Sequence, residues 1–277
     1  MAKGFSLHIG LNYIDPTHYD GNDGSLPSCI NDAHQMLKIA TKLGYQTQIL
    51  RNEGATRDAV KEQILQVANQ ITSDDIFLLT YSGHGCQIPN IGPAGEEKDD
   101  ADDTWALYDG QLVDDELWHL WSYFPDNARI LVFLDSCHSE SAVKVINLSE
   151  EVEEINLLPK SLSSTVAVKT FEKNEEFYLE IMSELPNPPK DVNARILLIA
   201  GCQENQTSRA GSGPWSLSAL TKQVVNVWDR GKFEGSYEDF YSAIVARMPD
   251  LVDQYPTCTL FGKRDQNFLL EKPFSIG

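Results

Sequence analysis

The sequence predicts an α/β fold in which helices flank a mostly parallel central sheet. Short apolar runs alternate with stretches in which apolar residues recur every three or four positions, and this alternation of strands and helices is typical of parallel sheets. Two runs, 76–81 and 130–134, are apolar almost without interruption, as expected for strands that helices cover on both faces. In such sheets, reactive groups lie beyond the carboxyl ends of the strands.

The first half of the chain begins with a predicted strand at 5–12, an apolar run. A helix follows at 28–43, because its apolar residues share one face. That face consists of Ile30, Ala33, Leu37 and Ala40. Gly44 ends this helix, since glycine readily adopts the left-handed conformation that closes a helix. A second strand is predicted at 45–50.

The second helix is predicted at 56–71, with Thr56 as its N-cap, because a threonine hydroxyl can accept a hydrogen bond from the first helical turn. Its apolar face consists of Val60, Ile64, Val67 and Ile71. The buried strands 76–81 and 130–134 come next, with a short helix at 114–121 between them. These elements complete the front region, which we place at residues 1–138.

The pattern weakens between residues 139 and 193. This segment has 11 acidic residues, five lysines and no arginine, and a connection of its length is either functional or disordered. Regular structure resumes with a strand at 194–200, helices at 215–228 and 237–248, and a last strand at 257–261. We therefore expect a front region, an acidic linker at 139–193, and a back region at 194–277 that completes the same sheet of about six strands.

The chain has 277 residues and a formal net charge of −19, from 22 basic and 41 acidic side chains. Such a surface repels phosphate backbones and anionic lipids, so we exclude nucleic acids and membranes as partners and expect basic peptides or proteins. No apolar run approaches the roughly 18 residues of a spanning helix, and no signal peptide is evident. The five cysteines suggest neither disulfides nor a zinc site, so we expect a cytoplasmic protein with reduced thiols. We also expect it to be a monomer.

Polar clusters follow the two buried strands, where reactive groups are expected. His84 lies between two glycines in the first cluster, and Cys137 lies in the second, 53 residues later. A thiol is only partly ionised at neutral pH, so a nucleophilic cysteine needs a nearby imidazole. A single histidine or cysteine at the end of a strand would suggest only a role in core packing. The two clusters together, with the histidine before the cysteine, favour a catalytic pair.

The clusters resemble those of the metacaspases and orthocaspases, which are caspase-fold cysteine peptidases. The resemblance rests on Tyr-Ser-Gly-His-Gly at 81–85, Asp-Ser-Cys-His-Ser at 135–139 and Cys-Ile-Asn-Asp-Ala at 29–33. Segments 113–116 and 201–208 give weaker support. The resemblance implies a caspase-like three-layer sandwich, with a p20-like front region and a p10-like back region. The Gln-Ala-Cys signature of true caspases is absent, so aspartate specificity is not implied.

The resemblance implies a cysteine endopeptidase in which Cys137 is the nucleophile and His84 is the general base and acid. The backbone N–H groups of Gly85 and Cys137 would form the oxyanion hole, and the acyl intermediate would be a thioester. Metacaspases line the primary specificity pocket with residues at the positions of Cys29, Asp32, Ser82 and Asp135. Two carboxylates in a confined pocket favour cleavage after arginine or lysine, although each acid could instead stabilise a helix or strand end.

Many metacaspases bind calcium, and the resemblance implies ligands at Asp102, Asp114 and Asp115. The fourth ligand position holds Lys144, whose ammonium could replace the cation, so we expect an enzyme that requires no cofactor. A weakened calcium site and a solvated acidic surface are the alternatives.

The family often cuts itself after a basic residue in the connecting segment. The candidate cleavage sites are Lys160, Lys169, Lys173 and Lys190, and we favour Lys169 because its neighbours are apolar. Alternatively, the segment is an insertion that is not cleaved and has no function. Two functions from other classes stay open. One is a catalytically silent scaffold that binds partners, and the other is a calcium-responsive acidic binding protein.

Overall fold

The computed structural model describes residues 1–89, 101–137, 157–186, 190–203, 206–249 and 254–277. A six-stranded sheet of order β11-β9-β7-β3-β1-β2 forms its centre. Its strands are β1 (Gly4–Gly10), β2 (Gln46–Arg51), β3 (Ile76–Ser82), β7 (Arg129–Asp135), β9 (Arg195–Ala200) and β11 (Thr257–Gly262). All neighbouring strands are parallel except β11, which runs antiparallel to β9. The predicted six-stranded, mostly parallel sheet is therefore confirmed.

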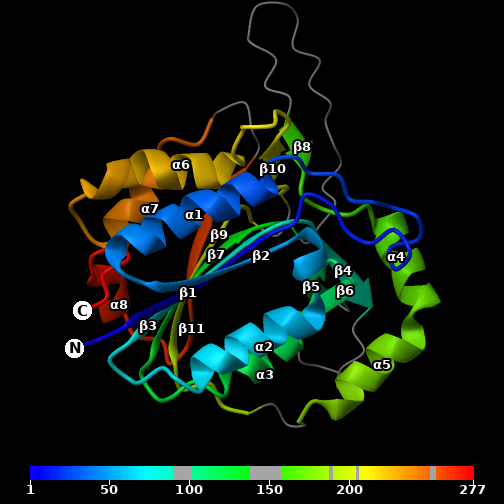
Figure 1. Cartoon of the computed structure of the whole chain (residues 1–277), viewed down its shortest axis with the longest axis horizontal. Coiled ribbons are helices and arrows are strands. Elements are labelled where there is room, and N and C mark those ends of the chain that lie inside the picture. Colours follow the sequence, from blue (N-terminus) through cyan, green and yellow to red (C-terminus); the bar gives the residue numbers. More distant parts are fainter. Residues whose placement is uncertain (90–100, 138–156, 187–189, 204–205, 250–253) are drawn as a thin grey trace, which may run out of the picture.

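Helices cover both faces of this sheet, as Figure 1 shows. One layer contains α1 (Cys29–Leu43), α6 (Ala219–Trp228), α7 (Tyr237–Val245) and the short α8 (Asn267–Leu270), and the other contains α2 (Arg57–Ala68) and α3 (Asp114–Trp121). Because side chains alternate along a strand, neighbouring residues of β3 enter different cores. Leu78 packs in the apolar cluster of the first layer and Leu79 in that of the second. The fold is a three-layer sandwich.

The predicted ends of the first two helices are confirmed. The hydroxyl of Thr56 accepts a hydrogen bond from the backbone N–H of Ala59 at 3.2 Å. Gly44 has a φ of 87°, the left-handed conformation expected of a glycine that closes a helix. These two features fix the connections that lead into β2 and α2.

Several elements were not predicted, because their apolar patterns are short or interrupted. A second sheet consists of β4 (Gly85–Pro89), β5 (Ala101–Leu107) and β6 (Gly110–Val113), and a two-stranded sheet pairs β8 (Leu157–Pro159) with β10 (Arg209–Gly211). Within the segment interpreted as a linker, α4 (Ser164–Lys173) and α5 (Glu175–Glu184) follow β8. Strand β5 carries two aspartates, which are depleted in strands, and α5 buries only Tyr178. The segment 139–193 is therefore not loop throughout.

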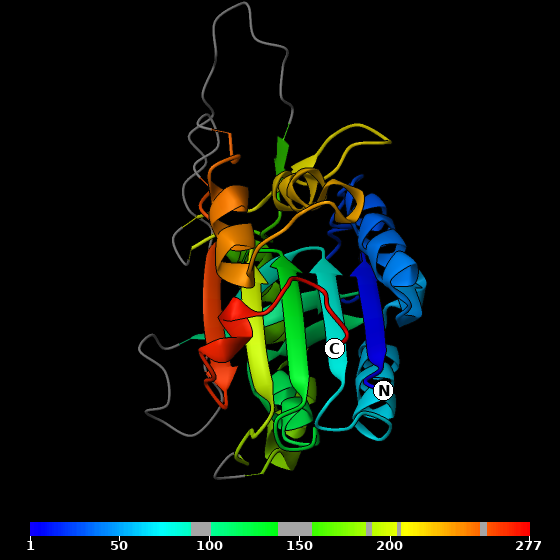
Figure 2. The same cartoon turned by 90° about the vertical axis from the view of Figure 1, so that its left-hand side faces the viewer.

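The parallel strands of the central sheet all end at the same edge. Figure 2 shows β8 beyond the arrowheads of these strands. The N-termini of α1 and α6 reach the same edge, where Asp32 on α1 contacts Ser218, which precedes α6. In the described ranges, no helix combines the length and the apolar character that crossing a bilayer requires.

Candidate active site

The register of β3 with β7 brings the two catalytic candidates to one place. Ser82 and Asp135, the last residues of these adjacent strands, are paired partners. His84 and Cys137 each follow two residues later, so both leave the sheet at the same point. Both are buried, with exposed fractions of 8% and 1%. The structure thus places the imidazole and the thiol on neighbouring connections at the carboxyl edge of the sheet.

His84 is neutral at neutral pH. Burial lowers its pKa to about 4, and hydrogen bonding to the backbone of Gly24 opposes this shift. Gly24 lies directly against the ring, since a Cβ at this position would come within 3.0 Å of His84 Cδ2, and its φ is 55°. A neutral imidazole can accept a proton from a thiol. Gly24 is a site residue that no sequence motif had marked.

The backbone N–H groups predicted to form the oxyanion hole converge on one carbonyl group. The N–H groups of Gly85 and Cys137 donate to the carbonyl oxygen of Lys160 at 2.9 and 3.2 Å. Two donors at these distances are the arrangement that stabilises a developing oxyanion in acyl transfer. The Cys137 thiol donates to the backbone carbonyl of Gln206.

The four residues assigned to the specificity pocket lie together and are all buried. Asp32 accepts a hydrogen bond from Ser82 Oγ at 2.7 Å and from the Ser218 backbone N–H at 2.9 Å, and also from the Ser218 hydroxyl. Asp135 accepts from Ser208 Oγ at 2.6 Å and from Thr221 Oγ1 at 2.9 Å. The fourth residue, Cys29, has a thiol whose pKa burial raises to about 12. The hydrogen bonds fix the two carboxylates within the pocket.

The side chain of Lys160 occupies this pocket and is fully buried. Its Nζ lies 2.8 Å from Ser82 Oγ, 3.1 Å from Asp135 Oδ1 and 3.4 Å from Asp32 Oδ2, and it donates to the Asp135 carbonyl oxygen at 2.9 Å. Burial alone would lower the pKa of the Lys160 ammonium, but Asp135 and Asp32 raise it above its ordinary value. Burial raises the pKa of Asp32, and Lys160 opposes that shift. The pocket therefore holds a charged ammonium.

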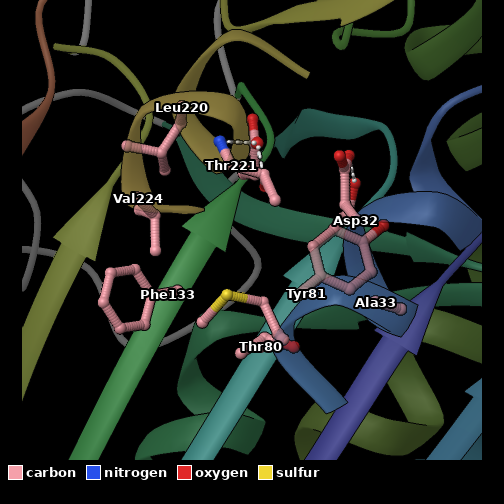
Figure 3. Close-up of a pocket in the computed structure, with 11 residues that line it drawn as sticks. Asp32, Ala33, Thr80, Tyr81, Phe133, Leu220, Thr221 and Val224 are labelled. Carbon is pink, nitrogen blue, oxygen red and sulfur yellow. Dashed lines mark hydrogen bonds between the residues drawn. The ribbon is translucent and has the colours of Figure 1, made fainter. Parts of the chain in front are cut away.

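Both carboxylates, Asp32 and Asp135, also line a small cavity, which Figure 3 shows. Apolar side chains, among them Phe133, Leu220 and Val224, line one side of it, and Asp32 lies on the other side. Apolar surroundings strengthen the attraction between a bound cation and the carboxylates. They also explain why both carboxylates are hydrogen-bonded to hydroxyl groups, since a buried charge without partners is costly.

Sequence reasoning missed the residues that complete the pocket. The hydroxyl groups of Ser208, Ser218 and Thr221 hold the carboxylates, but only Ser208 belongs to a segment, 201–208, that the resemblance had marked. Ser218 precedes α6 as its N-cap, yet its hydroxyl bonds to Asp32 and caps no helical N–H. Lys160 was one of four lysines considered as sites of self-cleavage, and no local feature of the sequence distinguished it from the other three.

The remaining candidates lie away from the pocket or outside the described residues. Lys169 lies on α4, where its Nζ is 3.7 Å from Asp20 Oδ2. Asp102 is buried, and its neighbour Asp103 lines a groove with Asp114 and Asp115. In the part of the chain that the structure describes, no three acidic, histidine or cysteine side chains are grouped so as to hold a metal ion. Lys144 lies outside the described residues.

Comparison with known proteins decides the family. The profile of the family described as Caspase domain matches residues 13–265, which is most of the chain. The chain belongs to the caspase domain family. Curated relatives of this caspase domain include Metacaspase-1 of Candida glabrata, 27% identical over 241 residues, and Metacaspase-1 of Cryptococcus neoformans, 28% identical over 315 residues. These matches confirm the resemblance to metacaspases.

The two alignments cover 73% and 97% of this caspase domain but only 58% and 64% of the relatives. The chain therefore spans less than two thirds of the length of these metacaspases.

Solved structures confirm the caspase-like fold. A crystal structure of a protein from Geobacter sulfurreducens is 41% identical, covers 99% of both chains and has a TM-score of 0.85. Caspase-1 of Spodoptera frugiperda has a TM-score of 0.54 at 11% identity, covering 95% of this chain and 88% of that one. The latter similarity concerns the fold alone.

Proposed function

We propose that this caspase domain is a cysteine endopeptidase that cleaves after lysine or arginine. One observation carries the proposal: a basic residue, Lys160, occupies both halves of the site at once. Its carbonyl oxygen accepts hydrogen bonds from the N–H groups of Gly85 and Cys137, while its ammonium lies between Asp32 and Asp135. A substrate bound in the same way would have its scissile carbonyl next to Cys137.

The chemistry follows from the positions of these groups. Neutral His84 accepts the proton of the Cys137 thiol, and the thiolate attacks the scissile carbonyl carbon. The N–H groups of Gly85 and Cys137 stabilise the negative charge that develops on the carbonyl oxygen. His84 then donates its proton to the leaving amine, and water hydrolyses the thioester to restore the thiol.

Specificity for a basic residue follows from the charge of the pocket. Two buried carboxylates need a cation, because leaving them unpaired when a neutral side chain enters is costly. The net charge of −19 also favours the approach of basic peptides. The retention of both His84 and Cys137 argues against a silent scaffold.

The proposal includes independence from calcium. Lys144 lies where the metacaspase resemblance implies a calcium ligand, and an ammonium there can pair with the acidic side chains. No step of the reaction above requires a metal ion.

Hydrolysis of matched peptide amides tests the proposal. Three fluorogenic amides are compared: Leu-Pro-Lys, copied from residues 158–160, and versions ending in arginine or glutamine. We expect kcat/KM for the two basic peptides to exceed that for the glutamine peptide by about 100-fold or more, because glutamine leaves the carboxylates unpaired. The rates should be equal in a calcium buffer and in a chelator.

Each of these comparisons has an outcome that would contradict the proposal. Comparable turnover of the glutamine peptide would reject the specificity, and a strict need for calcium would reject the proposed independence. An absence of turnover in both buffers, from a protein shown to be folded by circular dichroism, would reject the peptidase and favour the scaffold.

A further inference from the structure

We propose that a peroxide joins the thiols of Cys137 and Cys202 in a disulfide, which inactivates the site until a thiol reductant breaks the bond. The proposal makes Cys202 a resolving cysteine, which captures an oxidised neighbouring cysteine as a disulfide. Formation of the bond depends on the two thiols alone, whereas its effect on activity rests on the proposed peptidase function. All five cysteines are free in the structure, so the bond is a modification of the reduced fold.

The pairing of β7 with β9 brings the two cysteines to the same edge of the sheet. Leu134 and Ala200 are partners on these parallel strands, which lie side by side in Figure 2. Cys137 follows Leu134 by three residues and Cys202 follows Ala200 by two. Neighbouring strands are about 4.8 Å apart, and a disulfide joins Cα atoms that are about 4.4–6.8 Å apart. The topology thus places the two cysteines within reach of a disulfide.

The side chains of the two cysteines are in contact. A hydrogen bond joins the thiols of Cys137 and Cys202. The Cys202 Sγ also lies 3.7 Å from the carbonyl oxygen of Ser136, the residue before Cys137. The backbone N–H of Gly201, the residue before Cys202, donates to the Leu134 carbonyl at 2.8 Å. These contacts hold Cys202 against the connection that carries Cys137, so the bond requires no rearrangement of the sheet.

The hydrogen bond between the thiols gives them different roles. It raises the pKa of the Cys202 thiol, and burial adds to this shift. Cys202 therefore keeps its proton, while neutral His84 can accept the proton of Cys137. Peroxides oxidise thiolates in preference to thiols. Cys137 is therefore oxidised first, and Cys202 reacts with the product.

The other three cysteines lie in surroundings that keep them protonated. Burial raises the pKa of the Cys86 thiol to about 12, and this thiol contacts Thr104 Oγ1 and Gln111 Nε2, each at 3.1 Å. Burial also raises the pKa of Cys29 to about 12 and that of Cys258, on β11, to about 11. Thiols with such pKa values carry little thiolate at neutral pH.

The oxidation consumes one peroxide molecule, and hydrogen peroxide is small enough to approach the well-covered Cys137. The Cys137 thiolate attacks one peroxide oxygen and becomes a sulfenic acid, while the departing hydroxide takes from His84 the proton that the thiol gave up. The Cys202 sulfur then attacks the sulfenic sulfur, and its proton leaves with the hydroxyl group as water. In total, two thiols lose two hydrogen atoms, and the peroxide is reduced to two molecules of water.

The first oxidation makes the second one easier. A sulfenic acid carries no negative charge on its sulfur, so it no longer holds the proton of Cys202 in place. The resulting disulfide leaves Cys137 without a thiolate that could attack a carbonyl group. It also stops further oxidation to sulfinic and sulfonic acids, which thiol reductants do not reverse. The pair therefore inactivates the site and protects it at the same time.

Peptide mapping of the oxidised full chain tests the bond itself. The reduced protein is treated with hydrogen peroxide, free thiols are alkylated in denaturant, and the digest is analysed without reductant. We expect a single pair of linked peptides, which contain Cys137 and Cys202, in wild type and in the control Cys258→Ala. The link should be absent from Cys202→Ala and from Cys202→Ser, which preserves the size of the side chain. This readout requires no peptidase activity.

Recovery of activity tests the reversible inactivation. Hydrolysis of the Leu-Pro-Lys amide should be lost on oxidation, and dithiothreitol should restore it in wild type and in Cys258→Ala. Cys202→Ala and Cys202→Ser should recover at least about threefold less activity than wild type, because their Cys137 proceeds to acids that dithiothreitol does not reduce. Each variant is compared with its own reduced sample, so differences in basal activity do not affect the result.

Other outcomes would contradict the proposal. A link between other cysteines, or conversion of Cys137 in wild type to a sulfinic acid without any link, would reject the pair. Equal recovery of wild type and both Cys202 variants would reject the protective role, and full activity of the linked protein would reject the inactivation. A link that forms in a chain with no peptide turnover would support the disulfide and reject the proposed peptidase.

Discussion

Replacing Cys137 with alanine is expected to abolish peptide hydrolysis and any self-cleavage. Removal of the proposed nucleophile would leave only the proposed oxyanion hole and binding contacts, so the expected loss in kcat is on the order of 10⁵-fold or more. The side chain is buried but small, and its loss removes one sulfur atom, so the fold should persist. Hydrolysis of the Leu-Pro-Lys amide measures the first effect, and the melting temperature checks the second.

Cys202 provides a matched control, because its thiol interacts directly with that of Cys137. Its Sγ lies 3.7 Å from the Ser136 carbonyl oxygen, and a hydrogen bond with the Cys137 side chain raises the pKa of the Cys202 thiol. Cys202→Ala should keep at least about a tenth of the activity, since no step of the reaction uses this thiol. An equal loss in both variants would contradict the assignment of Cys137 alone as nucleophile.

Replacing Asp135 with asparagine is expected to remove the preference for a basic residue. Asparagine keeps the shape of the side chain but loses the charge that lies 3.1 Å from the Lys160 ammonium. Removal of one partner of a buried charge pair costs about 2–5 kcal/mol, so kcat/KM for the lysine peptide should fall by about 30-fold or more. Turnover of the glutamine peptide should change much less, and the ratio of the two values is the diagnostic measurement.

Asp58→Asn is the control for Asp135→Asn. Asp58 lies on α2 with 97% of its side chain exposed, and exposed charges of this kind contribute little interaction free energy. Asp58→Asn should change the ratio of kcat/KM for the lysine and glutamine peptides only slightly, whereas Asp32→Asn should lower this ratio as Asp135→Asn does. The pocket assignment fails if the lysine and glutamine peptides lose activity to the same extent in Asp135→Asn, because that pattern indicates a general loss of structure.

Much of this site could be predicted from the sequence, because it depends on local order along two strands. The continuous apolar runs of β3 and β7 located the sheet edge, and polar residues immediately beyond them located His84 and Cys137. Parallel strands in register then bring such residues together without further information. The resemblance to metacaspases added the pocket acids Asp32 and Asp135, which the structure brings together around the Lys160 ammonium.

The residues that were missed depend on contacts between distant parts of the chain. Ser218 is 186 positions from its partner Asp32, and no local pattern marks a serine for such a role. Strand β8 has only three residues, which is too few for an alternating pattern to be recognised. Lys160 therefore resembled any other lysine of an acidic segment until the pairing of β8 with β10 placed it in the pocket.

The central claim is that Cys137 faces the carbonyl group of a residue whose cation lies between Asp32 and Asp135. Covalent labelling tests it most directly. The protein is treated with a Leu-Pro-Lys peptide carrying a thiol-reactive chloromethyl ketone in place of the scissile amide, and the modified residue is found by peptide mass mapping. We predict one label, on Cys137, which a glutamine analogue does not give and which Asp135→Asn greatly slows. Labelling of another cysteine, or equal labelling by the glutamine analogue, would contradict the account.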